Sequence, residues 1–145
     1  MGDIAKDINS TFPNEKVKAL INIKYTANWL DAIENEILKP YQISVQQYNI
    51  LRILRGAKKE IPVNTIKERM IQKSPNATRL MDKLCDKNFI ERTRCENDRR
   101  VVFIKISEKG LKILDKIDSK EFENHMNAIT EEEAKLLNKL LDKIR

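Results

Sequence analysis

The side chains best suited to chemistry in this sequence are arginines and small polar residues between positions 74 and 100. Guanidinium groups bind phosphates and the edge of guanine, and an asparagine amide pairs with the edge of adenine. Recognition of phosphates and base edges is therefore the chemistry that these residues suit. A first group of candidate contacts comprises Ser74, Asn76, Ala77, Thr78 and Arg79. A second group comprises Arg92, Arg94, Asp98, Arg99 and Arg100.

The sequence contains no comparable set of residues for catalysis or for metal binding. His125 is the only histidine, and no Cys/His/Asp cluster accompanies it at metal-ligand spacing. One histidine cannot complete a catalytic triad with these cysteines. We therefore expect no enzymatic activity, no metal and no cofactor. Cys85 is expected to be buried or half-buried. Cys95 follows Arg94, whose charge favours the reactive thiolate, so a redox role for Cys95 is a minor hypothesis.

The positive charge of the chain is concentrated in its middle. The 65 residues from 41 to 105 hold 15 Lys and Arg against 7 Asp and Glu, a net charge of +8, whereas each flank carries −1. A polyanionic partner for this segment is one explanation, because phosphate neutralisation by Lys and Arg drives association with nucleic acid. A solvated lysine-rich surface is the alternative.

Two short helices joined by a tight turn are predicted to position the first polar group. One runs from Val63 to about Met70, and the turn 71–73 follows it. Ser74 is a preferred N-cap for the next helix, and Pro75 suits its first position, where a missing N–H costs nothing. This arrangement is a helix-turn-helix. An earlier helix is predicted from the capping-box spacing of Ser44 and Gln47, with Gly56 as its end.

A β-hairpin is predicted to position the second polar group. Phe89 and Ile90 begin one strand, and the β-branched run 101–106 suits its partner. Asn97 and Asp98 favour the turn between the strands, so the following arginines project from its far side. Alternation places three apolar residues on the face that covers the helices: Val102, Ile104 and Ile106.

Long amphipathic helices are expected at both ends of the chain, after a loose arm of about a dozen residues. The first spans residues 14–39, because Pro40 cannot continue it. A second follows Ser107, and a capping box at Thr130 and Glu133 starts a terminal helix. The second is predicted from apolar residues at helical spacing: Leu111, Leu114, Ile117, Phe122, Met126 and Ile129. A second copy of the chain could cover these apolar faces; the alternative is a monomer whose end helices pack on each other.

The length of 145 residues fits one domain. No apolar run approaches the roughly 20 residues of a membrane span, and the N-terminus lacks the apolar core of a signal peptide. We therefore expect a cytoplasmic protein with no membrane partner.

Four motifs, in order, resemble the MarR family of bacterial transcription regulators. They are Thr78-Arg79-Leu80 with Leu84, Glu91-Arg92, Asp98-Arg99-Arg100, and Ser107-Glu108-Lys109-Gly110. The resemblance implies a mainly α fold with a small β-hairpin wing in a single domain, residues 1–145. Its winged helix-turn-helix would occupy residues 41–106, flanked by dimerisation helices at 14–39 and 108–145. One departure is Asn88, where the family usually has glycine; asparagine also tolerates the left-handed geometry of such a turn.

The resemblance also implies a function. Such a protein is a homodimer on double-stranded DNA, most often a repressor that leaves a pseudo-palindromic operator in response to a small molecule. Arg100 would enter the minor groove, with Asp98 orienting nearby basic side chains and Arg99 on a phosphate. A small aromatic or anionic effector is also implied, in a cleft that Tyr25, Trp29 and Tyr48 could line. The alternative is that those three aromatic residues simply fill the core.

Two other classes fit the same pattern. The basic face could belong to a winged-helix module that binds an acidic protein, or to an architectural protein that binds DNA regardless of sequence. Operator binding requires both steep salt dependence and preference for one sequence, which separates it from both alternatives.

Overall fold

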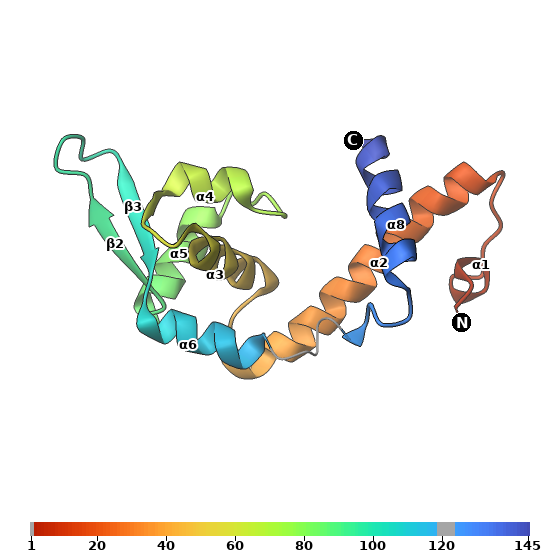
Figure 1. Cartoon of the computed structure of the whole chain (residues 1–145), viewed down its shortest axis with the longest axis horizontal. Helices are drawn as coiled ribbons and strands as arrows, with labels where there is room; N and C mark the ends of the chain where they lie inside the picture. The colour runs from red at the N-terminus through yellow and green to blue at the C-terminus, as the bar shows by residue number, and fades with distance from the viewer. Residues whose placement is uncertain (1, 119–123) are drawn as a thin grey trace.

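The computed structural model describes residues 2–118 and 124–145. One end of the molecule is a lobe of short helices with a small sheet, and the other end holds both chain termini (Figure 1). The long helix α2, Glu15–Leu38, runs from the terminal end to the lobe. The predicted mainly α fold with a winged helix-turn-helix is confirmed.

The N-terminal region agrees with the prediction for the long helix but not for the arm. The side chain of Asn14 accepts a hydrogen bond from the Val17 N–H at 2.9 Å and caps α2 at the predicted position. Pro40 lies in the 3-10 turn η1, Lys39–Tyr41, that follows the helix. The predicted loose arm is wrong in part, because the short helix α1, Ile4–Asp7, forms there and buries Ile4.

The winged lobe contains α3, Val45–Ala57, followed by the helix-turn-helix of α4, Val63–Arg69, and α5, Ala77–Asp86. The predicted capping box of Ser44 and Gln47 begins α3. Two predicted ends are wrong. Gly56 lies inside α3, which ends instead at Lys58 in the left-handed conformation with φ of 55°. Ser74 does not cap α5, whose N-cap is Asn76 and which begins two residues later than the Ser74–Pro75 signal indicates.

A three-stranded antiparallel sheet closes the lobe in the order β1-β3-β2. Strands β2, Ile90–Arg94, and β3, Val102–Ile106, form the predicted hairpin, with Arg94 opposite Val102. Ile104 and Ile106 are buried on its inner face, as the alternation predicts. The unpredicted strand β1, Ile61–Pro62, pairs with β3 and is too short to show a period. Asn88 adopts the expected left-handed conformation, with φ of 60°.

The described C-terminal residues include two separate helices. Ser107 caps α6, Glu108–Ile117, and the predicted capping box at Thr130 begins α8, Glu131–Ile144. The predicted continuous helix from Ser107 through Ile129 is wrong, because α6 ends at Ile117 and residues 125–129 form turns and a bend. Phe122 lies outside the described residues.

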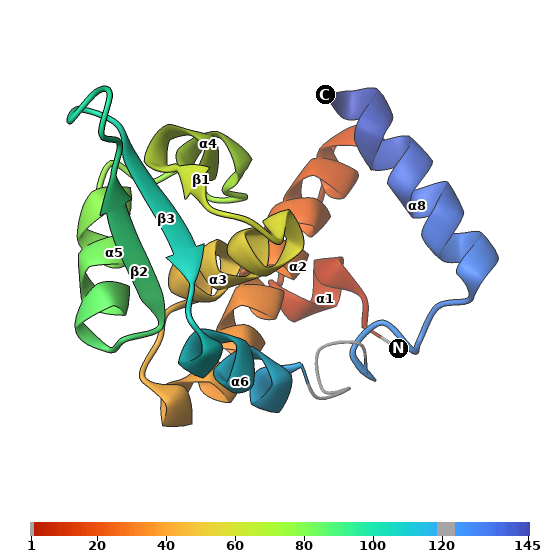
Figure 2. The same cartoon turned by 60° about the vertical axis from the view of Figure 1, so that its left-hand side comes forward.

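The hydrophobic core lies within the winged lobe, between α3, α5, α6 and the sheet. Leu51, Met81, Ile104 and Leu114 are each fully buried there. In contrast, Leu38 is the one buried residue among the described residues of α2, and α8 buries none. Turning the molecule shows α8 standing apart from the winged lobe (Figure 2). In the part of the chain that the structure describes, each helix is too short or too polar to cross a bilayer.

Candidate nucleic-acid interface

Helix α5 divides the predicted contact residues between the core and the surface. Ala77, Met81 and Leu84 occur at i, i+4 and i+7, share one face of the helix and are at most 1% exposed. Thr78 and Arg79 follow Ala77 and are exposed. The predicted set therefore needs one correction: the Ala77 side chain packs in the core and cannot contact a partner. Leu80, Met81 and Leu84 face the core as the helical spacing predicts.

The segment before α5 is a turn that leaves its polar side chains at the surface. The Ser74 hydroxyl oxygen accepts a hydrogen bond from the Asn76 N–H at 3.2 Å, and the Ser74 carbonyl accepts one from the Ala77 N–H at 3.2 Å. Asn76 occupies the N-cap position of α5 and is exposed. Its side chain makes no capping hydrogen bond to the described residues of α5, so its amide can be offered to a base edge.

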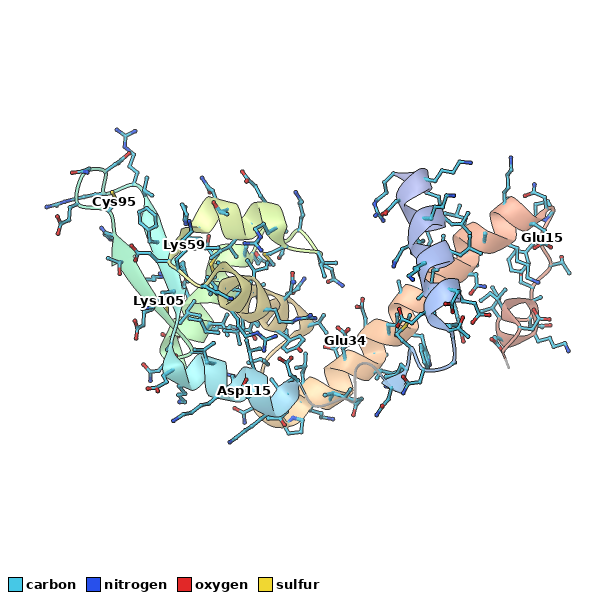
Figure 3. All side chains as sticks on the ribbon, viewed as in Figure 1. Glu15, Glu34, Lys59, Cys95, Lys105 and Asp115 are labelled. Atoms are coloured by element: carbon cyan, nitrogen blue, oxygen red, sulfur yellow. The ribbon has the colours of Figure 1, made fainter. Side chains whose placement is uncertain are left out.

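The wing tip presents arginine on a backbone that is held in place. The Cys95 N–H donates to the Val101 carbonyl at 2.9 Å, and the Val101 N–H donates to the Asp98 carbonyl at 3.0 Å. One carboxylate oxygen of Asp98 accepts a hydrogen bond from the Arg100 N–H at 3.0 Å and lies 3.8 Å from Arg100 Nε. The Arg100 side chain is nevertheless 95% exposed. Asp98 therefore orients a guanidinium that remains available to a polyanion, and Figure 3 shows this loop, marked by Cys95, projecting beyond the sheet.

Arg92 has a different environment from the other wing arginines. Its guanidinium forms an ion pair with Asp82, on the exposed side of α5, and so ties strand β2 to the recognition helix. Arg94 and Arg99 are exposed, as phosphate contacts require. The side chain of Arg92 keeps 38% exposure.

A basic groove of about 320 Å³ brings these elements together. Its lining includes Thr78 of α5, Arg92 of β2 and Arg100 of the wing. It also includes two residues of α4, Asn64 and Lys67, that the sequence reasoning did not single out. The sequence gives little reason to select them, because a single lysine on a short helix belongs to no recognisable binding motif. The groove places polar and cationic groups from α4, α5, β2 and the wing on one surface, as binding along a nucleic-acid backbone requires.

Comparison with known proteins identifies the family. Residues 32–117 match the family described as transcriptional regulator SarA/Rot. The chain belongs to this family of transcriptional regulators. The regulator is also 26% identical over 113 residues to the HTH-type transcriptional regulator MhqR of Bacillus subtilis, and the match covers 76% of this chain and 77% of that one. Together with the solved MarR structures that it resembles, this confirms the MarR resemblance seen in the sequence.

Two solved structures have the same fold as this regulator. A mutant of MarR from Escherichia coli, in complex with operator DNA, superposes with a TM-score of 0.72 at 25% identity and covers 99% of each chain. The organohalide-sensing regulator RdhR, in its 2,4-dichlorophenol-bound form, superposes with a TM-score of 0.77 at 23% identity, covering 91% of this chain and 80% of that one.

The structure does not bring the predicted effector residues of this regulator into one site. Tyr48 is 5% exposed and belongs to the core, whereas Tyr25 and Trp29 lie on the exposed side of α2 and line a separate hollow. Trp29 makes an edge-to-face contact with His125, with ring centroids 5.7 Å apart. Within one chain the three aromatic residues line two separate hollows, Tyr48 the one between α2 and α3 and Tyr25 and Trp29 the other.

Tyr48 instead connects two distant helices. Its hydroxyl donates to a carboxylate oxygen of Asp118, at the end of α6, at 2.7 Å, and Arg55 of α3 forms an ion pair with the other oxygen. Burial and the bond to Asp118 raise the pKa of Tyr48. Burial alone would raise the pKa of Asp118, but the hydrogen bonds from Arg55 and Tyr48 outweigh it and lower that pKa.

The two cysteines are both half-buried and unpaired with each other. For Cys85 this agrees with the expectation from its helical spacing. Burial raises the pKa of the Cys85 thiol, which disfavours the thiolate that reacts with oxidants. His125 is exposed and lies in a turn.

Proposed function

We propose that this regulator is a homodimeric repressor that binds a pseudo-palindromic operator and is released from it by a small molecule. The observation that carries the proposal is the groove that joins Thr78 of α5 to Arg100 of the wing, with both side chains available to DNA. In winged helix-turn-helix proteins the recognition helix enters the major groove, and arginine suits the narrow adjacent minor groove. The operator complex of Escherichia coli MarR supports the same partner for this chain.

The terminal helices support the homodimer. Large apolar side chains of α8 are left uncovered in a single chain, including Leu136 at 56%, Leu140 at 51% and Ile144 at 69% exposure. On α2, Leu20 is 52% exposed. A soluble monomer rarely leaves such a contiguous apolar patch open, whereas a two-fold partner covers it and places two recognition helices one DNA turn apart, about 34–36 Å.

The small-molecule signal is supported by the fold neighbour that holds 2,4-dichlorophenol. A ligand regulates only if it binds the DNA-competent and the released arrangements with different affinities. The proposed effector would therefore act between the terminal helices and the winged lobe, whose relative positions set the distance between the two recognition helices. An operator-binding protein would also work in the cytoplasm, where bacterial DNA lies.

Selection from random duplex DNA tests this proposal. The purified protein is expected to enrich an inverted repeat, and its affinity for that site should fall steeply with salt. Arg100→Ala should weaken binding by about 1–3 kcal/mol. The matched control is Lys116→Ala, which removes an exposed cation from α6, away from the groove, and should leave the affinity unchanged.

The outcome separates the three classes named from the sequence. Equal affinity for every duplex, with a steep salt dependence, would leave only an architectural DNA-binding protein. Failure to bind duplex DNA at low salt would leave only the protein-interaction module. If Lys116→Ala weakens binding as much as Arg100→Ala, the wing makes no specific contact.

A further inference from the structure

A cleft of about 220 Å³ lies between α2 and α3, beside the turn that joins α4 to α5. Its apolar wall includes Leu30 of α2, Val45 of α3 and Ile71 of the turn. Ile71 is 84% exposed, an unusual state for an isoleucine in a folded lobe. The cleft is thus a small concave site with an apolar wall, positioned where the long terminal helix meets the helix-turn-helix.

The α2 side of the cleft also carries two carboxylates against the single cation of the lining, Arg52. Asp31 and Glu34 occur at i and i+3 on α2, so their carboxylates share the face that lines the cleft. Asp31 accepts a hydrogen bond from the amide of Gln72, and Glu34 forms no ion pair or hydrogen bond with the described residues. Figure 3 shows Glu34 on α2 in the region between the winged lobe and the terminal helices.

The one cation of the cleft lining does not neutralise both carboxylates. The guanidinium carbon of Arg52 lies 5.6 Å from the centre of the Tyr48 ring, a cation–π arrangement. Among the described residues Arg52 forms no ion pair with Asp31 or Glu34, so its guanidinium nitrogens lie more than 4.0 Å from the oxygens of both carboxylates. Burial raises the pKa of Glu34 and the neighbouring Asp31 adds to the rise, which the charge of Arg52 only partly offsets, so a further negative charge would be disfavoured there.

The size of the cleft limits its occupant. Drug-sized ligands occupy pockets of about 300–1,000 Å³, whereas an apolar cavity of about 150 Å³ holds benzene. A volume of about 220 Å³ therefore suits a molecule of one aromatic ring with a small polar substituent.

We propose that this cleft binds a small aromatic cation, whose ring packs against Leu30, Val45 and Ile71 and whose charged group pairs with Asp31 and Glu34. This ligand class differs from the anionic effector that the family resemblance implies. The reason lies in this chain's own side chains, since two carboxylates face one arginine that is already stacked on Tyr48.

The cleft is connected to the recognition helix through the turn before it. The Gln72 amide donates to Asp31 at 3.0 Å, and the Ile71 N–H donates to the side-chain oxygen of Asn49 at 2.9 Å, so the turn is tied to α2 and α3. A cation that pairs with Asp31 competes with Gln72 for the same carboxylate. The turn would then shift, and with it the start of α5. This effect on operator affinity rests on the proposed function; binding in the cleft does not.

Three probes of one shape and different charge test the site: benzamidine, which is a cation at pH 7, benzoate and benzyl alcohol. Calorimetric titration of the full-length protein without DNA is expected to give a benzamidine affinity at least tenfold above that of the other two. Glu34→Gln, which removes the charge but keeps the shape, should weaken benzamidine at least fivefold. The matched control, Glu36→Gln, changes an exposed carboxylate of α2 that does not line this cleft and should have no effect.

Several results would overturn the proposal. They are equal or tighter binding of benzoate, no binding of any probe, or the same affinity for benzamidine in Glu34→Gln as in the native chain. Operator titration with and without benzamidine then tests the coupling separately. If the probe binds in the cleft but the protein shows no operator preference, the proposed function fails and the ligand site stands.

Discussion

Gly110 is the residue whose substitution tests the packing of the winged lobe most directly. It is the last residue of the Ser107–Gly110 motif and lies in the first turn of α6. A Cβ added there would lie 2.8 Å from Cγ1 of Ile106 and 3.2 Å from the carbonyl carbon of Phe89, and closer still to the Phe89 carbonyl oxygen. That oxygen accepts the Ser107 N–H at 3.0 Å, so it cannot retreat without straining the junction between the sheet and α6.

The magnitude follows from two opposing contributions. Alanine is favoured over glycine within a helix by about 1 kcal/mol. Overpacking a close contact costs about 1–3 kcal/mol, and here one of the crowded atoms is backbone, which cannot adopt another rotamer. A weakened Ser107–Phe89 hydrogen bond adds about 1 kcal/mol. We therefore expect Gly110→Ala to destabilise the protein by about 1–3 kcal/mol despite its better helix propensity.

Gly56→Ala is the matched control. Gly56 also lies inside a helix, but a Cβ there would meet nothing within 4 Å among the described atoms, and its φ is not positive. The higher helix propensity of alanine should then stabilise the Gly56→Ala variant by about 0.5–1 kcal/mol. Urea unfolding followed by circular dichroism, at one protomer concentration, should move the two midpoints in opposite directions with little change in slope. A Gly110→Ala protein at least as stable as the native chain would refute the packing argument.

Four further outcomes follow from the structure. Because the pKa of Asp118 is lowered, its ionised carboxylate stabilises the fold above the unfolded-state pKa, and this contribution is lost as pH falls through the folded-state pKa. Asp118→Asn should therefore cost about 1–2 kcal/mol in urea unfolding at pH 7, and the loss should shrink as pH falls below the unfolded-state pKa. Glu34 has a raised pKa, so its negative charge opposes folding at neutral pH. Glu34→Gln should therefore raise the melting temperature at pH 7 but not at pH 4. An equal rise at both pH values would show that the charge of Glu34 does not destabilise the fold. Leu140→Asp should shift sedimentation from dimer to monomer, whereas an unchanged dimer would show that α8 lies outside the interface. Arg99→Ala should lower the salt slope of operator binding by about 1 without changing the preferred sequence, and a changed preference would mean that Arg99 reads bases.

Much of the fold was predictable because its signals are local. The caps at Ser44, Ser107 and Thr130 all lie where the sequence places them, since a cap depends on hydrogen bonds within three residues. The hairpin and the burial of Ile104 follow from a two-residue period. The Ser74–Pro75 signal misplaced the start of α5, because the same residues also favour a turn.

The candidate site was likewise predictable where its signals are local, and not where it depends on the packing of helices. Thr78, Arg79 and Arg100 could be selected by type and spacing, and the structure leaves all three exposed. The burial of Ala77 could not be predicted from its place in a short polar stretch, because it depends on which face of α5 packs against α3. Lys67 enters the groove only through the position of α4 beside the wing.

By itself the sequence determined the recognition helix, the wing and the capped ends of most helices. The tertiary structure alone decided that Tyr48 bonds to Asp118, 70 residues away, that β1 joins the sheet, and that Asp31 and Glu34 face a cleft beside the helix-turn-helix. The physical reason is the range of each interaction. Caps, turns and periodic burial act over a few neighbouring residues, whereas the contacts between distant segments exist only after the helices have packed.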